Sequence, residues 1–229
     1  MLCLRIEHAI ALTRGVGFAG AVHHGEGDIE GAGPVEGRAH AGRGRHQGLA
    51  IAEIPAIGQA VIVGADLDDA AERHALIGEA THAAGAHLSA LVNCAAMFEH
   101  DTIDTLSEEL LQRHIALNTF TPSLLAREFA EALPDEARGV VVNFLDFKLA
   151  SPYPDHFSYT LSKYALSGAT DLLARALAPR VRVNAVAPGY VVPAPGQADA
   201  DYQRLHDDTP LARGPTPEDI AHAARFLIE

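Results

Sequence analysis

The sequence has few cysteines and contains no long apolar segment. Its 229 residues include two cysteines, Cys3 and Cys94, which are too few for a disulfide framework. No apolar run reaches the roughly 18 residues that a membrane-spanning helix requires, and no secretory signal is recognisable. We therefore expect a protein of the reduced cytoplasm that is not inserted in a membrane.

Basic residues are also scarce. Lysine and arginine number 17 against 30 aspartates and glutamates, which gives a formal net charge of -13. Nucleic acids and anionic membranes bind clustered positive charge, so we expect neither as a partner. Hydrophobic residues make up 48% of the chain, which is enough for the core of one large domain.

Residues 1–48 differ in composition from the rest of the chain. They hold eleven of the twenty glycines, five histidines and five arginines. Within them, TRGVGFAG has the spacing G-x-G-x-x-G at Gly15, Gly17 and Gly20, which is found in loops that bind phosphate. The glycine-rich stretch after it does not favour the helix that such a loop needs. A phosphate-binding loop and an irregular segment both remain open.

Four potential metal ligands lie in the same segment, but their order shows no repeated ligand spacing. We therefore expect no metal site there. We treat residues 1–48 as an atypical segment and expect one α/β domain over residues 49–229. The four residues are His23, His24, Glu26 and Asp28.

From Gln59 onward, apolar runs of strand length alternate with amphipathic segments of helix length. This alternation predicts a parallel sheet covered by helices on both faces, in a single Rossmann-like, doubly wound α/β domain. Thr216, Pro217 and Asp219 form a capping-box start for a last helix, and no further strand follows it. The expected strands are 60–66, 88–93, 139–145 and 181–189, with helices around 70–84, within 103–132 and around Tyr159.

The stretch HFSYTLSKYALSG, residues 156–168, places Tyr159 and Lys163 four residues apart on one expected helix. This spacing puts both side chains on the same face of the helix. A nearby positive charge favours the phenolate and makes a tyrosine a better acid near neutral pH. The spacing alone is common, so an ordinary helix with two amphipathic residues is the alternative.

Polar and small residues follow the ends of the expected strands. Ligands of open α/β sheets bind at the carboxyl ends of strands, so these residues are candidates for a binding site. Successive strands end at Asp66, at Asn93-Cys94-Ala95-Ala96, at Asp146 and at Pro188-Gly189.

Taken with Tyr159 and Lys163, this order of residues resembles the short-chain dehydrogenase/reductase family over residues 55–229. The resemblance implies an NAD(P)-dependent oxidoreductase in which Asp66 holds the adenine amino group and Asn93 stabilises the sheet beside the cofactor. An N-cap role for Asp66 is the alternative. By the same resemblance, Lys163 holds the nicotinamide ribose. The cofactor-binding residues implied are Asp66, Asn93, Ala95, Tyr159, Lys163, Pro188 and Gly189.

Asn118, in HIALNTFTP, matches a family asparagine that holds a proton-relay water near the lysine. The alternative is a buried amide whose hydrogen bonds are satisfied within the protein. The family also forms homo-oligomers, tetramers or dimers, through the helix within 103–132 and the helix of Tyr159.

Asp146 lies thirteen residues before Tyr159, where most of the family has serine. An ionised carboxylate only accepts hydrogen bonds, so it suits a substrate with several N–H donors. Aspartate here resembles the pteridine reductase and dihydromonapterin reductase branch. Phe98, five residues after Asn93, matches the phenylalanine with which that branch stacks the substrate ring. A loop aspartate and a core phenylalanine are the alternatives.

The resemblance implies an NADPH-dependent reductase of a pterin-like substrate, such as dihydromonapterin or dihydrofolate. Tyr159 would donate the proton, and Asp146 would bind the N–H groups of the substrate. Two alternatives remain open: a general carbonyl reductase of the same family, and a non-catalytic relic that does not bind a dinucleotide.

The family's N-terminal T-G-x-x-x-R-x-G loop is absent, and family-like sequence begins abruptly near residue 49. A shifted reading frame over residues 1–48 is one hypothesis for this change.

We expect the chain to bind NADPH weakly or not at all. A pyrophosphate needs converging backbone N–H groups at a helix start, and ordering a glycine-rich segment costs conformational entropy. Replacing residues 1–48 with a family-type strand, loop and helix should restore at least part of the binding. Calorimetric titration of NADPH and NADH compares the two chains. Micromolar affinity in the unmodified chain would instead assign Gly15, Gly17 and Gly20 to a working phosphate loop.

Overall fold

The computed structural model describes residues 9–13, 47–54, 59–193 and 198–229. The predicted phosphate loop, with Gly15, Gly17 and Gly20, lies outside these ranges. The four potential metal ligands of the same segment also lie outside them.

The described strands form one sheet in the spatial order β3-β2-β1-β4-β5-β6. The same order, 3-2-1-4-5-6, is found in doubly wound dinucleotide-binding sheets. The predicted α/β class is therefore confirmed. The strands are β1 Ala9–Thr13, β2 Gln47–Ile54, β3 Gln59–Asp66, β4 Ala90–Asn93, β5 Gly139–Phe144 and β6 Val181–Val186.

The sheet is parallel in part. β4, β5 and β6 run parallel to one another, and β1 runs parallel to β2. The pairs β1–β4 and β2–β3 are antiparallel, which the sequence did not predict. Residues 55–58 are too few for the crossover that a parallel pair needs, so β2 and β3 form an antiparallel pair. The division predicted at residue 48 falls inside β2.

The helices agree with the predicted positions, apart from α5, which the sequence analysis did not identify. The long helix expected within 103–132 is continuous, with a π-helical turn in its middle. Two helices begin at clear side-chain caps: Asp69 accepts from two amides of α1, and the predicted capping box of Thr216 and Asp219 is present in α6. The helices are α1 Ala70–Ala84, α2 Glu108–Ile115, the π-helical turn Ala116–Phe120, α3 Thr121–Ala132, α4 Phe157–Leu177, α5 Asp199–Asp207 and α6 Pro217–Ile228, with a 3-10 turn at Phe147–Leu149.

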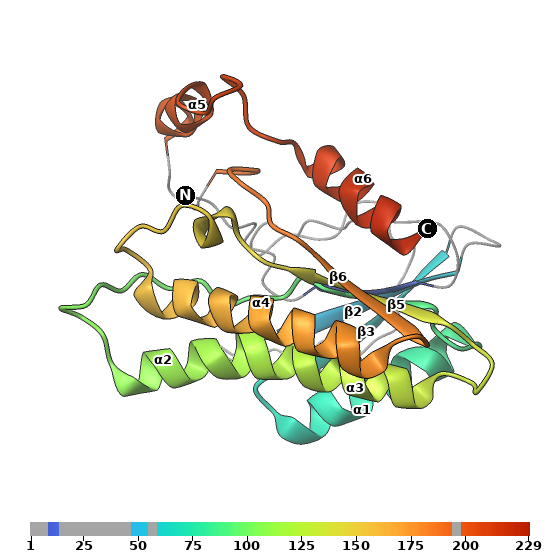
Figure 1. Cartoon of the computed structure of the whole chain (residues 1–229). Coiled ribbons are helices and arrows are strands. Elements are labelled where there is room, and N and C mark those ends of the chain that lie inside the picture. Colours follow the sequence, from blue (N-terminus) through green and yellow to red (C-terminus); the bar gives the residue numbers. More distant parts are fainter. Residues whose placement is uncertain (1–8, 14–46, 55–58, 194–197) are drawn as a thin grey trace.

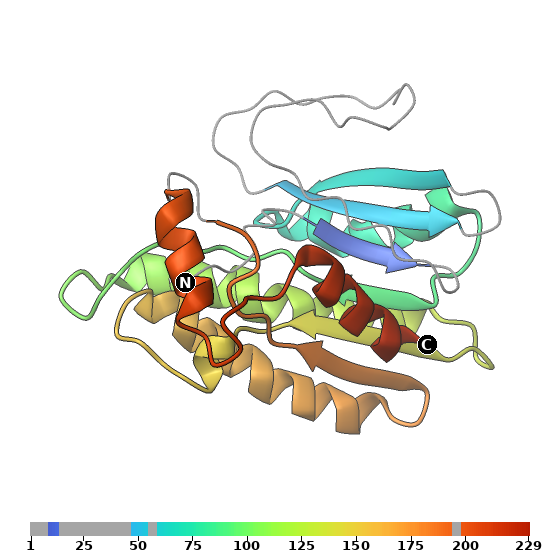
Figure 2. The same cartoon turned by 90° about the horizontal axis from the view of Figure 1, so that it is seen from above.

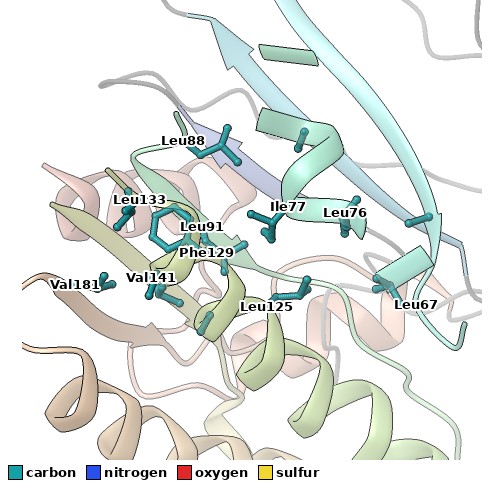
Figure 3. Close-up of a cluster of buried hydrophobic side chains, with 14 of the residues drawn as sticks. Leu67, Leu76, Ile77, Leu88, Leu91, Leu125, Phe129, Leu133, Val141 and Val181 are labelled. Carbon is teal, nitrogen blue, oxygen red and sulfur yellow. The ribbon is translucent and has the colours of Figure 1, made fainter. Parts of the chain in front are cut away.

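Helices α1, α3 and α4 cover one face of the sheet, and α6 covers the other (Figures 1 and 2). On the first face, apolar side chains from α1, α3 and the strands meet in the main core (Figure 3). Burial of each large apolar side chain contributes about 1.5–3 kcal/mol. The core includes Leu76, Ile77, Leu91, Leu125, Phe129, Val141 and Val181.

Strands β4 and β5 are buried along their whole length. Their other face packs against α6, where Val92 and Val142 belong to the same cluster as Ala224. Burial on both faces explains why these strands have continuous apolar sequences rather than alternating ones. Because β4, β5 and β6 are parallel, their carboxyl ends lie at one edge of the sheet.

Among the residues that the structure describes, no helix is both long enough and apolar enough to span a membrane.

Gly139, at the start of β5, gives a test of this packing. A Cβ there would lie 2.7 Å from a ring carbon of Phe129 and 2.8 Å from a methyl carbon of Leu133. We expect Gly139→Ala to lower the free energy of unfolding by about 1–3 kcal/mol, as overpacking does. Gly78, inside α1, has no atom within 4 Å of an added Cβ, so Gly78→Ala is the control. It should raise the free energy of unfolding by about 0.5–1 kcal/mol. Urea titration measures both, and equal effects would contradict the packing described.

Candidate active site

Tyr159 and Asp146 are in direct contact. Tyr159 lies in the first turn of α4 and is fully buried, and its hydroxyl donates to Asp146 Oδ2 at 2.7 Å. Asp146 follows the end of β5 and is also buried. Its other oxygen, Oδ1, accepts from the amide of Lys148 at 2.8 Å. The carboxylate is thus held between a backbone turn and a phenol.

Lys163 lies one turn further along α4, on the same face as Tyr159. Its Nζ is 5.6 Å from the centroid of the Tyr159 ring. It donates to the backbone oxygen of Phe144 at 2.6 Å, which ties α4 to the end of β5. Lys163 is buried, and a cation in this position interacts favourably with the aromatic face.

Asn118 lies in the π-helical turn between α2 and α3. Its Oδ1 accepts from the amide of Met97 at 2.7 Å, and its Nδ2 donates to the Met97 carbonyl and to Ser162 Oγ, both at 2.9 Å. These are the contacts of the alternative considered above, a buried amide with satisfied hydrogen bonds. The relay-water role stays a prediction. π-Helical turns of this kind often occur at functional sites.

Asn93 connects the two central strands. Its Nδ2 donates to Asn143 Oδ1, directly opposite on β5, at 2.9 Å. Asn143 in turn donates to Thr170 Oγ1 on α4 at 2.9 Å. This chain of buried polar groups joins β4, β5 and α4 beneath the strand ends. Asn143 and Thr170 were not identified from the sequence, although a polar residue in the run GVVVNF was a usable signal.

Phe98 lies between two other rings. It stacks on His156 with the ring centroids 4.1 Å apart and the planes 7° apart. It contacts the Tyr159 ring in a T-shaped arrangement, with the ring centroids 4.6 Å apart. Since one face of Phe98 is covered by His156, a planar ligand could stack only on the other face.

The start of α4 has an unusual cap. His156 occupies the N-cap position in the left-handed conformation, with φ 50°, and its side chain does not cap the helix. Asp101 provides the cap instead: its carboxylate accepts from the amide of Ser158 at 3.0 Å and from the Ser158 hydroxyl. A carboxylate at a helix start also interacts favourably with the helix dipole. Asp101 was not identified from the sequence.

His114 supports the same region from α2. It is fully buried, and burial lowers its pKa, so the ring is neutral. Its Nδ1 donates to the Leu110 carbonyl at 2.9 Å, and its Nε2 accepts from the amide of Glu99 at 3.3 Å. These bonds fix the segment that carries Phe98.

Asp66 forms hydrogen bonds within its own turn. Its Oδ1 accepts from the amide of Asp68 at 3.0 Å, and its own amide donates to Glu72 Oε2 at 2.7 Å. The N-cap of α1 is Asp69, so the alternative that Asp66 caps this helix is wrong. The adenine-binding role of Asp66 stays a prediction.

The remaining predicted cofactor residues lie after β4 and β6. Ala95 packs against the main core and Cys94 against the second cluster. The Pro188 carbonyl accepts from the amide of Phe147 at 3.0 Å. An added Cβ at Gly189 would have no atom within 4 Å, so packing within the described residues does not require a glycine there.

The structure therefore brings together five predicted residues, either in direct contact or through one intervening residue: Tyr159, Lys163, Asp146, Asn118 and Phe98. No group of three or more His, Cys, Asp or Glu side chains among the described residues is arranged to hold a metal ion. A buried phenol bonded to a carboxylate, with a lysine over the ring, is an arrangement suited to proton transfer.

Comparison with known proteins identifies the family. The family model described as enoyl-(acyl carrier protein) reductase matches residues 39–229. An uncharacterized oxidoreductase of Methylorubrum extorquens is 34% identical, over 74% of this chain and 70% of the relative. A 3alpha-hydroxysteroid dehydrogenase of Mediterraneibacter gnavus is 32% identical, over 70% of this chain and 65% of the relative.

A solved structure is also similar. FolM alternative dihydrofolate reductase 1 from Brucella canis, complexed with NADP, matches with a TM-score of 0.68 and 38% identity over 72% of this chain. This chain spans 64% of the Brucella chain, which is less than two thirds of its length. The chain belongs to the short-chain dehydrogenase/reductase family of NAD(P)-dependent oxidoreductases.

Proposed function

We propose that the intact form of this protein, with a family-type phosphate-binding start in place of residues 1–48, is an NADPH-dependent reductase of pterin-like substrates, such as dihydromonapterin or dihydrofolate, with residues 49–229 as its catalytic domain. The observation that carries the proposal is the buried Asp146 carboxylate bonded to Tyr159 OH at 2.7 Å. A carboxylate recognises paired N–H donors, which a pterin ring has and a simple ketone lacks. The similar Brucella reductase, solved with NADP, supports both the substrate class and the cofactor.

The residues present fit a nicotinamide cofactor. Asn93 Oδ1, at the carboxyl end of β4, is buried and accepts no hydrogen bond within the described residues. An acceptor of this kind suits a ligand with hydroxyl donors, such as a ribose. We expect Asn93, Lys163, Tyr159 and the Pro188-Gly189 segment to hold the nicotinamide half. Asp66 and Ala95 complete the set of proposed cofactor residues. When bound, the cofactor supplies the hydride.

Proton delivery belongs to Tyr159 and Asp146. The phenol donates to Asp146 Oδ2. We expect the N–H donors of a substrate to take over this oxygen, which releases the phenol proton toward the substrate. Lys163, over the ring, then favours the phenolate that is left. Asn118 supports the transfer from the π-helical turn by its bond to Ser162.

Phe98 is proposed to stack the substrate ring. Because His156 covers one face of Phe98, a substrate ring would have to use the opposite face, and a flat heteroaromatic ring gains from contact with an aromatic face. This contact would hold the substrate plane beside Tyr159.

The names of two relatives favour a second candidate, a general carbonyl reductase. One is the Mediterraneibacter steroid dehydrogenase, and the other is an NADPH-dependent aldehyde reductase of Arabidopsis thaliana that is 28% identical. In that case Asp146 would be dispensable or better replaced by serine.

We also propose a homo-oligomer, a tetramer or a dimer, formed through the long helix within 103–132 (α2, the π-helical turn and α3) and through α4. Large apolar side chains are exposed on the π-helical turn and along α4. They are Phe120, Leu161, Tyr164 and Leu172.

Tyr159→Phe tests the proton donor. We expect kcat to fall by about 10²–10⁴-fold, the range typical of general acid–base groups. The measurement is steady-state reduction of a dihydropterin by the chain in which residues 1–48 are replaced as above, at an NADPH concentration well above its dissociation constant. Tyr202→Phe, on α5, removes a hydroxyl outside the Tyr159–Asp146 contact, so it is the control and should change kcat little. Turnover close to wild type in Tyr159→Phe would remove the assigned role.

Asp146→Ser tests the substrate class. If the carboxylate binds paired N–H donors, its loss should weaken dihydropterin binding by roughly 1–3 kcal/mol. Activity on a small aldehyde or ketone should stay level or rise, because serine can donate to a carbonyl oxygen. The KM and kcat of both substrates are measured side by side. An equal loss on both would mean that Asp146 acts only through the structure of its turn.

A further inference from the structure

Lys148 is a buried cation beside the active site. It lies in the 3-10 turn after β5, and its side chain is 0% exposed. Its Nζ donates to Asp155 Oδ1 at 2.7 Å and to the Asp155 carbonyl at 2.8 Å. Removing a charge from water is costly unless the charge is paired and hydrogen-bonded, so this geometry is needed to keep Lys148 in place.

The backbone amide of Lys148 contacts Asp146, the carboxylate that is proposed to bind the substrate. Its amide donates to Asp146 Oδ1 at 2.8 Å, while Tyr159 donates to the other oxygen. Lys148 therefore links Asp146 at one end of the turn to Asp155 at the other end. The segment between β5 and α4 is closed at both ends by one residue.

His156, which follows Asp155, supports the second group that is proposed to face the substrate, the ring of Phe98. Its left-handed backbone and its bond from Nδ1 to the Glu99 carbonyl, at 3.1 Å, fix the ring. Burial lowers the pKa of His156 to about 4, so the imidazole is neutral. The neutral ring stacks on Phe98, which in turn meets Tyr159.

We propose that Lys148, together with Asp155, is a positioning residue of the reductase. It holds the Asp146 carboxylate and the His156–Phe98 ring pair at a fixed separation on either side of Tyr159. The proposal rests on the proposed function, because these two groups are the ones that would recognise a flat ring with N–H donors. Since Nζ is fully buried and bonded to Asp155, Lys148 acts through other groups and does not touch the substrate.

Burial alone would raise the pKa of Asp155, but the hydrogen bond and charge of Lys148 lower it. Asp155 is therefore ionised at neutral pH and pairs with the ammonium. Its side chain is 43% exposed, so the pair can be changed from its outer end with little disturbance of the core.

The test compares Lys148→Met, Asp155→Ala and Asp155→Asn. Lys148→Met and Asp155→Ala should raise the KM for a dihydropterin by roughly tenfold, the effect of losing about one hydrogen bond to a charged group. The kcat, the KM for a small aldehyde and the dissociation constant of NADPH should stay within about threefold, because the proton donor and cofactor contacts are unchanged. Asp155→Asn keeps a side-chain oxygen and the backbone carbonyl as acceptors for Lys148 Nζ. Its KM for the dihydropterin should therefore stay close to the wild-type value.

Arg225→Met is the matched control. It breaks an ion pair with Glu229 of similar length, 2.6 Å, on α6 and away from the site. This variant should leave the KM for both substrates unchanged. A fall in kcat alone, or an equal rise in KM for both substrates, in the Lys148 and Asp155 variants would overturn the positioning role. If Lys148→Met does not fold, the two Asp155 variants carry the same comparison.

A second measurement separates this proposal from the proposed function. A wild-type chain that reduces the aldehyde but not the dihydropterin refutes the function. Hydrogen exchange of the backbone amides of residues 144–158 then tests the positioning role of Lys148 and Asp155 independently of the substrate. Exchange should be faster in Lys148→Met and Asp155→Ala and close to wild type in Asp155→Asn. Unchanged exchange rates in the first two variants would overturn the positioning role of Lys148 and Asp155.

Discussion

The hydrogen bond between Tyr159 OH and Asp146 Oδ2 is the contact on which the site depends. It joins the first turn of α4 to the end of β5, and both groups are buried where water does not weaken the bond. Lys163 repeats the same connection one turn later through Phe144. With Asp101 capping the helix start, α4 is fixed against the strand ends along its first two turns.

This arrangement requires a sheet that does not move beneath it. β4 and β5 are buried on both faces, between the main core and α6, so their ends are held by packing as well as by hydrogen bonds. The Asn93–Asn143–Thr170 chain adds polar contacts directly under the site. Each of these amides donates to the next, and a buried network of this kind favours a single arrangement of its members.

Sequence periodicity was sufficient for the helices that pack against the sheet and for the buried strands β4 and β5, because burial on one or both faces leaves a clear pattern. Helix α5 has no buried residue and was missed for that reason. The capping box at Thr216 and the shared helix face of Tyr159 and Lys163 follow from local spacing. Other features depend on contacts distant in the chain. The antiparallel pairing of β1 with β4, the burial of Lys148 and the stacking of His156 on Phe98 leave no periodic signal. From the sequence, Asn118 could be either a relay residue or a structural amide. Its partners, Met97 and Ser162, were found only in the structure.

The replacement of a hydroxyl by a carboxylate at position 146 changes what the whole turn must do. A serine can donate to a carbonyl oxygen without help, whereas an ionised carboxylate needs donors from the protein until a ligand brings its own. Tyr159 and the amide of Lys148 supply those donors, one to each oxygen. A ligand with N–H groups competes with Tyr159 alone, because the amide belongs to the backbone. In the proposed mechanism, substrate binding and release of the phenol proton are therefore coupled through a single oxygen atom, Asp146 Oδ2.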